Sequence, residues 1–186
     1  MIYKILLSVV MPFVKFFAHI YVAFKKPEMN GRAFRSIQSL IQPGDVLLSY
    51  TKGEASNFFN RERFTHGALY VGDGIVVESV GTGVREDHLS NFCFKKDHVI
   101  VLRFTKKIFI ESVISFAIAQ KGREYDNDFE DNGKKYYCFE LIAAAFKQAL
   151  PGLELPKQEI LDGEFYTCET FLSEFFKVVV DSKEDL

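Results

Sequence analysis

One cysteine lies where its thiol could act as a nucleophile. Cys138 stands in the run Tyr-Tyr-Cys-Phe-Glu-Leu, at the start of a stretch, 136–150, that we predict to be a helix. The first turn of a helix has unpaired backbone N–H groups and a positive dipole end, and both stabilise a thiolate. The same N–H groups can hold the oxyanion that forms during acyl transfer. Cys93 and Cys168 lack this setting, so Cys138 is the candidate nucleophile.

A thiol nucleophile needs a base, and the chain has four histidines. His66 lies inside a predicted strand, 64–71, beside small residues that leave room for another group. His19 belongs to an apolar N-terminal segment. His88 and His98 flank a Lys-rich stretch that reads as surface, although His98 begins a predicted strand and stays open as an alternative. We predict that His66 is the base.

The base must be oriented by a third group, usually a hydrogen-bond acceptor on its second ring nitrogen. Glu78 is an acidic residue in a stretch, 75–80, that is otherwise a mostly apolar predicted strand. The alternative is a carboxylate that simply faces solvent on a half-exposed strand. We predict that Glu78 completes a catalytic triad with Cys138 and His66.

The expected hairpin register supports that choice. Residues 72–74, Gly-Asp-Gly, are a strong signal for a turn between the two strands. If Val71 pairs with Ile75, then His66 and Glu78 point to the same face of the sheet, one diagonal step apart. That step is short enough for a hydrogen bond.

Several short motifs together resemble those of a known superfamily. The sequence resembles the permuted NlpC/P60 papain-like proteins, and within them the YiiX/YaeF-like group, which is related to certain poxvirus proteins. The order His, acid, Cys is the circularly permuted order of that group. The motifs that carry the resemblance are Gly-Asp-Val-Leu-Leu at 44–48, Phe-Thr-His-Gly-Ala-Leu at 64–69, Val-Glu at 77–78, Gly122 with Tyr-Asp at 125–126 and Phe129, and Tyr-Cys-Phe-Glu-Leu at 137–141.

The resemblance implies a papain-like core, with a small antiparallel sheet packed on the helix that begins at the cysteine. It matches Cys138 to the nucleophile, His66 to the base and Glu78 to the third polar residue. Glu140 matches an acid that makes a structural contact. Phe139 departs from the serine that often follows the cysteine, and the chain lacks the Asn-Cys-Glu-His run of relatives that process lipid acyl groups.

These observations predict a cysteine-dependent hydrolase or acyltransferase that acts on an amide or acyl ester through an acyl-enzyme. The substrate could be a peptide, a cell-wall amide or a lipid. The alternative is a non-catalytic lipid- or peptide-binding protein that keeps a papain-like groove. Alkylation would separate the two, because a catalytic thiolate reacts fast at neutral pH and a buried thiol does not.

Composition narrows the class of protein. With 186 residues, 48% hydrophobic and 26% charged, the chain is globular and long enough for one full core. Its net charge of −2 and the lack of a basic, aromatic-rich face argue against nucleic acid. Three widely spaced cysteines suggest neither a disulfide framework nor a metal motif, so we expect a reducing, cytoplasmic setting.

An acidic run at 126–133 resembles a calcium loop but fails its spacing. Counted from Asp128, the sixth position is Gly133, as an EF-hand requires, but the twelfth is Phe139 rather than a glutamate. We therefore expect no metal and no cofactor.

The first 26 residues form a separate unit in the sequence. They are almost wholly apolar. On a helical projection, five of their polar residues fall in one narrow stripe: Lys4, Ser8, Lys15, His19 and Lys26. Three interpretations stay open: a helix on a membrane surface, a helix buried against the domain or a sister chain in a homodimer, and a cleaved signal. We favour the first, with peripheral membrane attachment, because charges toward headgroups suit an interfacial helix.

The chain therefore divides into an amphipathic helix at 1–26, a linker with a short helix at 27–42, and a catalytic domain at 43–186. Grouped strands flanked by helices predict an α+β fold. The expected strands are 46–50, 64–71, 75–80, 98–104 and 175–180. The expected helices are 32–41, 54–61, 108–120, 136–150 and 167–172, with a loop and short helix at 85–92.

Overall fold

The computed structural model describes residues 28–52, 64–129, 133–160 and 163–184. Within these ranges, six strands form one antiparallel sheet in the order β4-β3-β2-β1-β5-β8. The strands are β1 Val46–Tyr50, β2 His66–Gly72, β3 Ile75–Val80, β4 Gly83–His88, β5 His98–Phe104 and β8 Phe176–Asp181. The helices are α2 Gly31–Leu40, α4 Leu89–Phe94, α5 Ile110–Ala119, α6 Cys138–Ala149 and α7 Cys168–Phe171. A separate small hairpin is made by β6 Gln158–Ile160 and β7 Gly163–Phe165.

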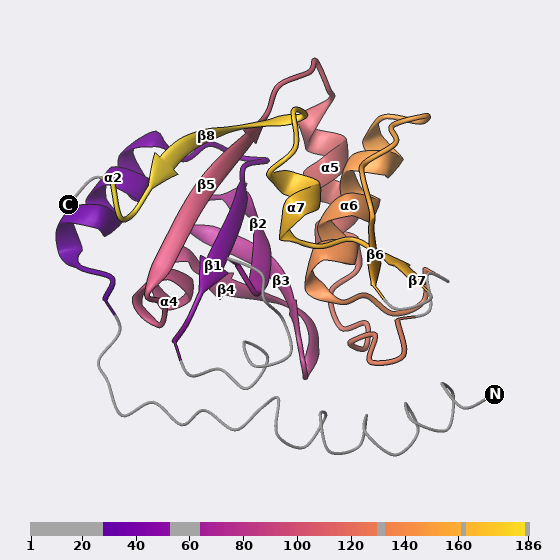
Figure 1. Cartoon of the computed structure of the whole chain (residues 1–186), viewed down its shortest axis with the longest axis horizontal. Helices are drawn as coiled ribbons and strands as arrows, with labels where there is room; N and C mark the ends of the chain where they lie inside the picture. The colour runs from indigo at the N-terminus through magenta and orange to yellow at the C-terminus, as the bar shows by residue number, and fades with distance from the viewer. Residues whose placement is uncertain (1–27, 53–63, 130–132, 161–162, 185–186) are drawn as a thin grey trace.

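Helices cover both faces of the large sheet (Figure 1). Side chains alternate between the faces along each strand, so the central strands contribute to two cores. In β1, Val46 and Leu48 belong to the larger core, whereas Leu47 belongs to the smaller one. Central strands that are buried on both sides read as continuous apolar runs, which is why the sequence at 46–50 was recognisable as a strand.

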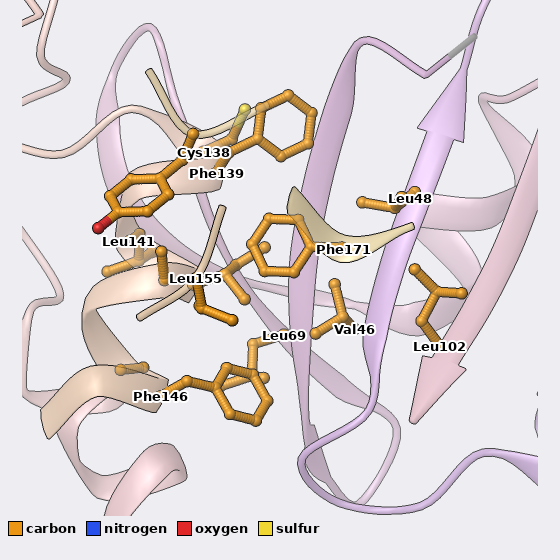
Figure 2. Close-up of a cluster of buried hydrophobic side chains, with 14 of the residues drawn as sticks. Val46, Leu48, Leu69, Leu102, Cys138, Phe139, Leu141, Phe146, Leu155 and Phe171 are labelled. Carbon is orange, nitrogen blue, oxygen red and sulfur yellow. The ribbon is translucent and has the colours of Figure 1, made fainter. Parts of the chain in front are cut away.

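The larger core lies between the sheet and α6. Figure 2 shows Val46, Leu69 and Leu102 of the sheet facing Leu141 and Phe146 of the helix. The other face is covered by α2 and α4, whose core residues Ile37, Leu89 and Phe92 meet Leu47 and Val101. The cysteine-bearing helix α6 therefore packs in the larger of the two cores.

The hairpin between β2 and β3 is tight. Asp73 and Gly74 both have positive φ values, 51° and 74°, which is the conformation of a two-residue turn whose twist suits the flanking strands. Gly72 pairs with Ile75, and an irregularity separates this pair from Tyr70. The predicted pairing of Val71 with Ile75 is therefore wrong, because the bulge takes up one extra residue at the turn. Beyond the bulge the register is the predicted one.

The predicted α+β fold is confirmed. Two predictions about its elements and one about the exposure of His98 need correction. Residues at the start of the expected loop and short helix, 85–92, instead form the edge strand β4 Gly83–His88, and the helix α4 follows it. The hairpin of β6 and β7 was not predicted. The expected surface position of His98 is wrong, since only 4% of the residue is exposed. The predicted helices at 1–26 and 54–61 lie outside the described residues.

Among the residues that the structure describes, no helix has both the length and the apolar character needed to cross a bilayer.

Candidate active site

Cys138 lies in the first turn of α6, as the sequence predicted, and is its first residue because the helix begins two residues later than expected. The first helical hydrogen bond runs from the Leu141 N–H to the Tyr137 carbonyl, so the N–H groups of the three residues before Leu141 lie in the first turn. In Figure 2 the cysteine lies at one end of the large core, beside Phe139. Only 5% of Cys138 is exposed, so this cysteine is packed at the start of the helix rather than open to solvent.

Two contacts anchor the start of this helix to the rest of the molecule. The Ser79 hydroxyl of β3 donates to the Tyr136 carbonyl at 2.5 Å. The Tyr137 hydroxyl accepts the Tyr166 N–H at 2.8 Å. Because Ser79 is the neighbour of Glu78, one strand positions both the acid and the beginning of the cysteine helix.

Glu140 makes the structural contact that the resemblance implied. Its Oε2 accepts the Tyr137 N–H at 3.3 Å, and the carboxylate is almost wholly buried. This bond satisfies a donor just before the helix, and the negative charge lies in the first turn, where it stabilises the helix dipole.

His66 and Glu78 meet across the hairpin. Ala68 is directly opposite Glu78, and His66 lies two residues before Ala68 on the same strand face. The His66 Nε2 lies 2.7 Å from Glu78 Oε2. The diagonal step expected from the sequence is therefore a hydrogen bond in the structure.

His66 also contacts the candidate nucleophile. Its ring is close enough to Cys138 for that side chain to raise the pKa of His66, and because Nε2 faces Glu78, the other ring nitrogen is the one available to the sulfur. Burial of the ring disfavours its cation, but Cys138 and Glu78 together outweigh burial and raise the pKa of His66 to about 9. At neutral pH the ring is therefore the imidazolium cation.

Gly67 explains how closely the helix approaches this strand. A Cβ at Gly67 would lie 3.1 Å from the Ile142 Cδ1 and 3.1 Å from the Phe139 ring. A larger residue would push α6 away from β2. The glycine that follows His66 thus helps to bring the cysteine helix and the histidine strand together.

The sequence did not identify Arg85 as a member of the site. Its Nε and Nη2 donate to Glu78 Oε1 at 2.9 and 2.7 Å. Burial favours the neutral carboxyl, but His66 and then Arg85 outweigh it and lower the pKa of Glu78 to about 2. Each carboxylate oxygen therefore has a cationic partner at neutral pH.

Arg85 was missed because β4 was missed. The sequence of β4, Gly-Val-Arg-Glu-Asp-His, is mostly charged and reads as a loop, although charges are common on edge strands. The Gly-Thr-Gly run at 81–83 could have indicated the turn that leads into β4. A two-residue turn there pairs Val80 with Gly83, and the same register places Glu78 opposite Arg85.

The other two cysteines lie in different settings. Burial raises the pKa of the Cys93 thiol to about 12, so it stays protonated at neutral pH. Cys168 also lies at the start of a helix, α7, so the expectation that it lacks such a setting is wrong. That helix has only four residues, and Cys168 is fully buried.

The remaining candidate base has a partner of its own. The His98 Nε2 lies 2.7 Å from Asp181 Oδ1, on the far side of the sheet order from the hairpin that carries His66. Its ring packs beside Phe64, with the centroids 4.9 Å apart. His98 therefore joins β5 to β8.

Comparisons with known proteins agree with this architecture. The chain covers 96% of the crystal structure of the metalloprotein YiiX from Escherichia coli O157:H7, which in turn covers 75% of this chain. The two share 17% sequence identity and a TM-score of 0.63, so they share the fold. No curated protein sequence matches the chain. The model of the permuted papain-like amidases of the YaeF/YiiX, C92 family matches residues 40–179. The resemblance drawn from the motifs is therefore confirmed: this chain belongs to the YaeF/YiiX family of permuted papain-like amidases, which are cysteine hydrolases.

Proposed function

We propose that the protein cleaves an amide or acyl ester through Cys138, His66 and Glu78, by way of an acyl-enzyme. The observation that carries the proposal is the hydrogen bond between His66 and Glu78, with Cys138 at the start of α6 close to the same imidazole. A nucleophile, a base and an orienting acid in contact are the requirements for nucleophilic acyl transfer.

The high pKa of His66 defines its role in the reaction. An imidazole with a pKa of about 9 is protonated at neutral pH, so its positive charge can stabilise the Cys138 thiolate that attacks the substrate. His66 is then ready to act as a general acid toward the leaving group. Glu78 orients the ring through Nε2 and stabilises its positive charge.

The steps follow from these positions. The thiolate attacks the substrate carbonyl, and the new oxyanion is held by N–H groups in the first turn of α6. The tetrahedral intermediate collapses, His66 protonates the departing amine or alcohol, and a thioester to Cys138 remains. Water gives a proton to the now neutral imidazole and attacks the thioester carbonyl. The second tetrahedral intermediate collapses, its C–S bond breaks, and the carboxylic acid leaves while Cys138 is released as a thiolate beside protonated His66. Another nucleophile in place of water would make the protein an acyltransferase.

YiiX is described as a metalloprotein, which raises the question whether the Cys138 site of this chain could hold a metal ion. In this chain both oxygens of Glu78 are engaged, one by His66 and one by the Arg85 guanidinium, whose charge would repel a cation. No group of three or more His, Cys, Asp or Glu side chains within the described ranges is placed to hold a metal ion. The donor set does not fit a metal, and the proposed reaction uses none.

The assignment of the nucleophile is tested by thiol labelling of the folded protein. Iodoacetamide at neutral pH should label Cys138 ahead of Cys93 and Cys168, as read by peptide mass spectrometry, and His66→Ala should slow that labelling. Equal labelling of the three thiols in the native protein would contradict the proposal. Cys93→Ala is the matched control and should leave both hydrolysis and labelling of Cys138 unchanged.

The substrate class is tested by trapping the acyl-enzyme. The protein is mixed with panels of peptides, cell-wall amides, lipids and thioesters, and the intact mass is recorded at short times. A productive acyl donor should add the mass of its acyl group to the wild type but not to Cys138→Ala. A mass shift that survives in Cys138→Ala would assign the reaction to another residue.

We further propose that residues 1–26 attach the protein to anionic membrane surfaces. The argument is the narrow cationic stripe of that segment, since basic residues near such a surface contribute about 1 kcal/mol each. Full-length protein should float with anionic liposomes, whereas a chain that starts at Asn30 should not. If neither form floats and both are monomeric with the same thermal stability, the segment has no such role.

A further inference from the structure

Arg85 lies on the far side of Glu78 from His66. Glu78 and Arg85 are direct cross-strand partners on β3 and β4, and the arginine donates two hydrogen bonds to Glu78 Oε1. We propose that Arg85 is a positioning residue of the reaction, which holds Glu78 charged and keeps its Oε2 turned toward His66. The inference rests on the proposed triad and adds a fourth group to it.

The need for such a group follows from the burial of Glu78. Only 5% of its side chain is exposed, so water cannot replace a lost partner on Oε1. With His66 alone, the carboxyl could rotate about its last bond or take a proton, and either change would remove the acceptor that orients the imidazole. Two donors on one oxygen prevent both changes, because they fix the plane of the carboxylate and neutralise its charge.

The charges around the pair are consistent with this role. Glu78 is faced by His66 from β2 and by Arg85 from β4, and both favour its ionised form over the opposing effect of burial. His66 is faced by Cys138 from α6 and, more weakly, by Lys96 after α4, which disfavours its cation. Arg85 is also 3.6 Å from Asp87 on its own strand.

The charges beside Glu78 alternate along one line of contacts: imidazolium, carboxylate and guanidinium. Removing the guanidinium takes away one of the two cations that hold the buried carboxylate charged, so Glu78 binds a proton at a higher pH. Once Glu78 is neutral, the imidazolium loses the negative charge that supports it and gives up its proton more readily.

The chain contains a matched control for this arrangement. Arg103 Nε and Nη2 donate to the two oxygens of Asp45, at 2.8 and 2.8 Å, and the Asp45 side chain is 2% exposed. This pair has the same chemistry, a partly exposed arginine on a buried acid, and it joins β5 to the residue before β1. It has no histidine in the row, so its loss should affect stability alone.

The test compares Arg85→Gln, Arg85→Lys and Arg103→Gln in the full chain. Each variant is assayed for hydrolysis of p-nitrophenyl acetate, for the pH dependence of Cys138 alkylation by iodoacetamide, and for thermal unfolding. Arg85→Gln should lower kcat about tenfold with KM nearly unchanged, the loss expected for one charged hydrogen-bond partner. Its alkylation profile should shift its acid limb to higher pH by about one unit.

The two other variants decide whether the effect is specific. Arg85→Lys keeps the charge, so its acid limb should return to the wild-type position while kcat recovers only in part, because one ammonium replaces a two-donor fork. Arg103→Gln should lower the unfolding temperature and leave kcat and the alkylation profile unchanged. Those results together would establish the positioning role.

Three results would overturn the inference: a wild-type alkylation profile in Arg85→Gln, an Arg85→Lys variant no better than Arg85→Gln, or equal losses of kcat in Arg103→Gln. The alkylation profile needs no substrate. If wild-type protein hydrolyses no ester or amide, the proposed function fails while the shift in that profile still tests Arg85. If hydrolysis occurs and the profile does not move, only the role of Arg85 fails.

Discussion

The sheet carries two histidine–carboxylate pairs that are almost identical as pairs. The His66 Nε2 lies 2.7 Å from Glu78, and the His98 Nε2 lies 2.7 Å from Asp181. The first pair joins β2 to β3, and the second joins β5 to the edge strand β8. Both are buried or nearly so, with 15% and 5% of the histidine side chains exposed.

The register of the two pairs is also the same. Ala68 is opposite Glu78, and Ile100 is opposite Asp181. In each case the histidine lies two residues before the residue that faces the acid, so the contact is the same diagonal step across an antiparallel pair. That step places a histidine and an acid within hydrogen-bond distance wherever the two residue types occur in it.

What differs is the third group. The first pair has Cys138 on the free side of its imidazole and Arg85 on the free side of its acid. In the second pair the imidazole packs beside the Phe64 ring, and the acid accepts the N–H of Lys183. The first pair therefore lies beside the candidate nucleophile, and the second fastens the C-terminal strand. A histidine–acid pair thus becomes a candidate for catalysis only when the helix layer places a nucleophilic side chain beside it.

Replacing each histidine by glutamine should separate the proposed catalytic role of the first pair from the structural role of the second most clearly. His66→Gln should lower kcat by on the order of 10³-fold, because the general acid and base is lost. His98→Gln should leave kcat within about twofold and lower the unfolding temperature, since it loses one buried hydrogen bond. The measurement is ester hydrolysis together with a thermal melt. A large loss of kcat in His98→Gln at a temperature where it is folded would break the comparison.

Changing the acids should give a smaller contrast of the same kind. Glu78→Gln should lower kcat by about 100-fold, because a neutral amide supports the imidazolium poorly. Asp181→Asn should destabilise the fold by about 1–3 kcal/mol without changing kcat. Chemical denaturation and steady-state kinetics measure the two effects. Equal kinetic losses in both variants would show that the second pair also reaches the site.

The first pair should make the stability of the fold depend on pH. A pKa raised from 6.5 to about 9 means that His66 stabilises the fold below pH 6.5 and that this contribution is lost as pH rises through 9. Activity should fall in the same range, because the neutral imidazole cannot protonate the leaving group. Unfolding free energy measured from pH 6 to 10 should decline in the wild type, and His66→Gln should lack that decline. A wild-type curve that is flat over this range would argue against the charged pair.

The residues that follow the two histidines offer the finest test. Gly67→Ala adds a methyl group 3.1 Å from Phe139 and should lower kcat by about threefold, since the start of α6 must shift by a few tenths of an ångström. Val99→Ala removes buried atoms next to His98 and should cost about 2 kcal/mol of stability with kcat unchanged. Kinetics and denaturation of the two variants, side by side, measure this contrast. Unchanged kcat in Gly67→Ala would mean that the position of α6 tolerates such a shift.

The parts of the site that could be predicted are those set by local sequence. Cys138 was placed at a helix start because helical periodicity and the apolar run after it are readable within a dozen residues. The approach of His66 to Glu78 followed from a turn signal and the period of two along a strand. Even the bulge at Gly72 did not disturb this step, because it lies between the turn and the pairs that matter.

The parts that were missed depend on neighbours distant in sequence or on an unusual strand. Arg85 escaped notice because the charged edge strand β4 is stabilised by pairing with β3 and by the docking of the loop after α5, rather than by an apolar pattern of its own. His98 was assigned to the surface because its partner, Asp181, is 83 residues away and the strand that carries it closes the far edge of the sheet.

The sequence by itself placed the candidate nucleophile at a helix start and a histidine one diagonal step from an acid, because helix starts and hairpin registers are local properties of the chain. Only the tertiary structure decided which histidine–acid pair meets the sulfur. That choice depends on how α6 packs on β2 at Gly67 and on which charges are buried together. Packing and burial are properties of the whole fold, so no short stretch of residues specifies them.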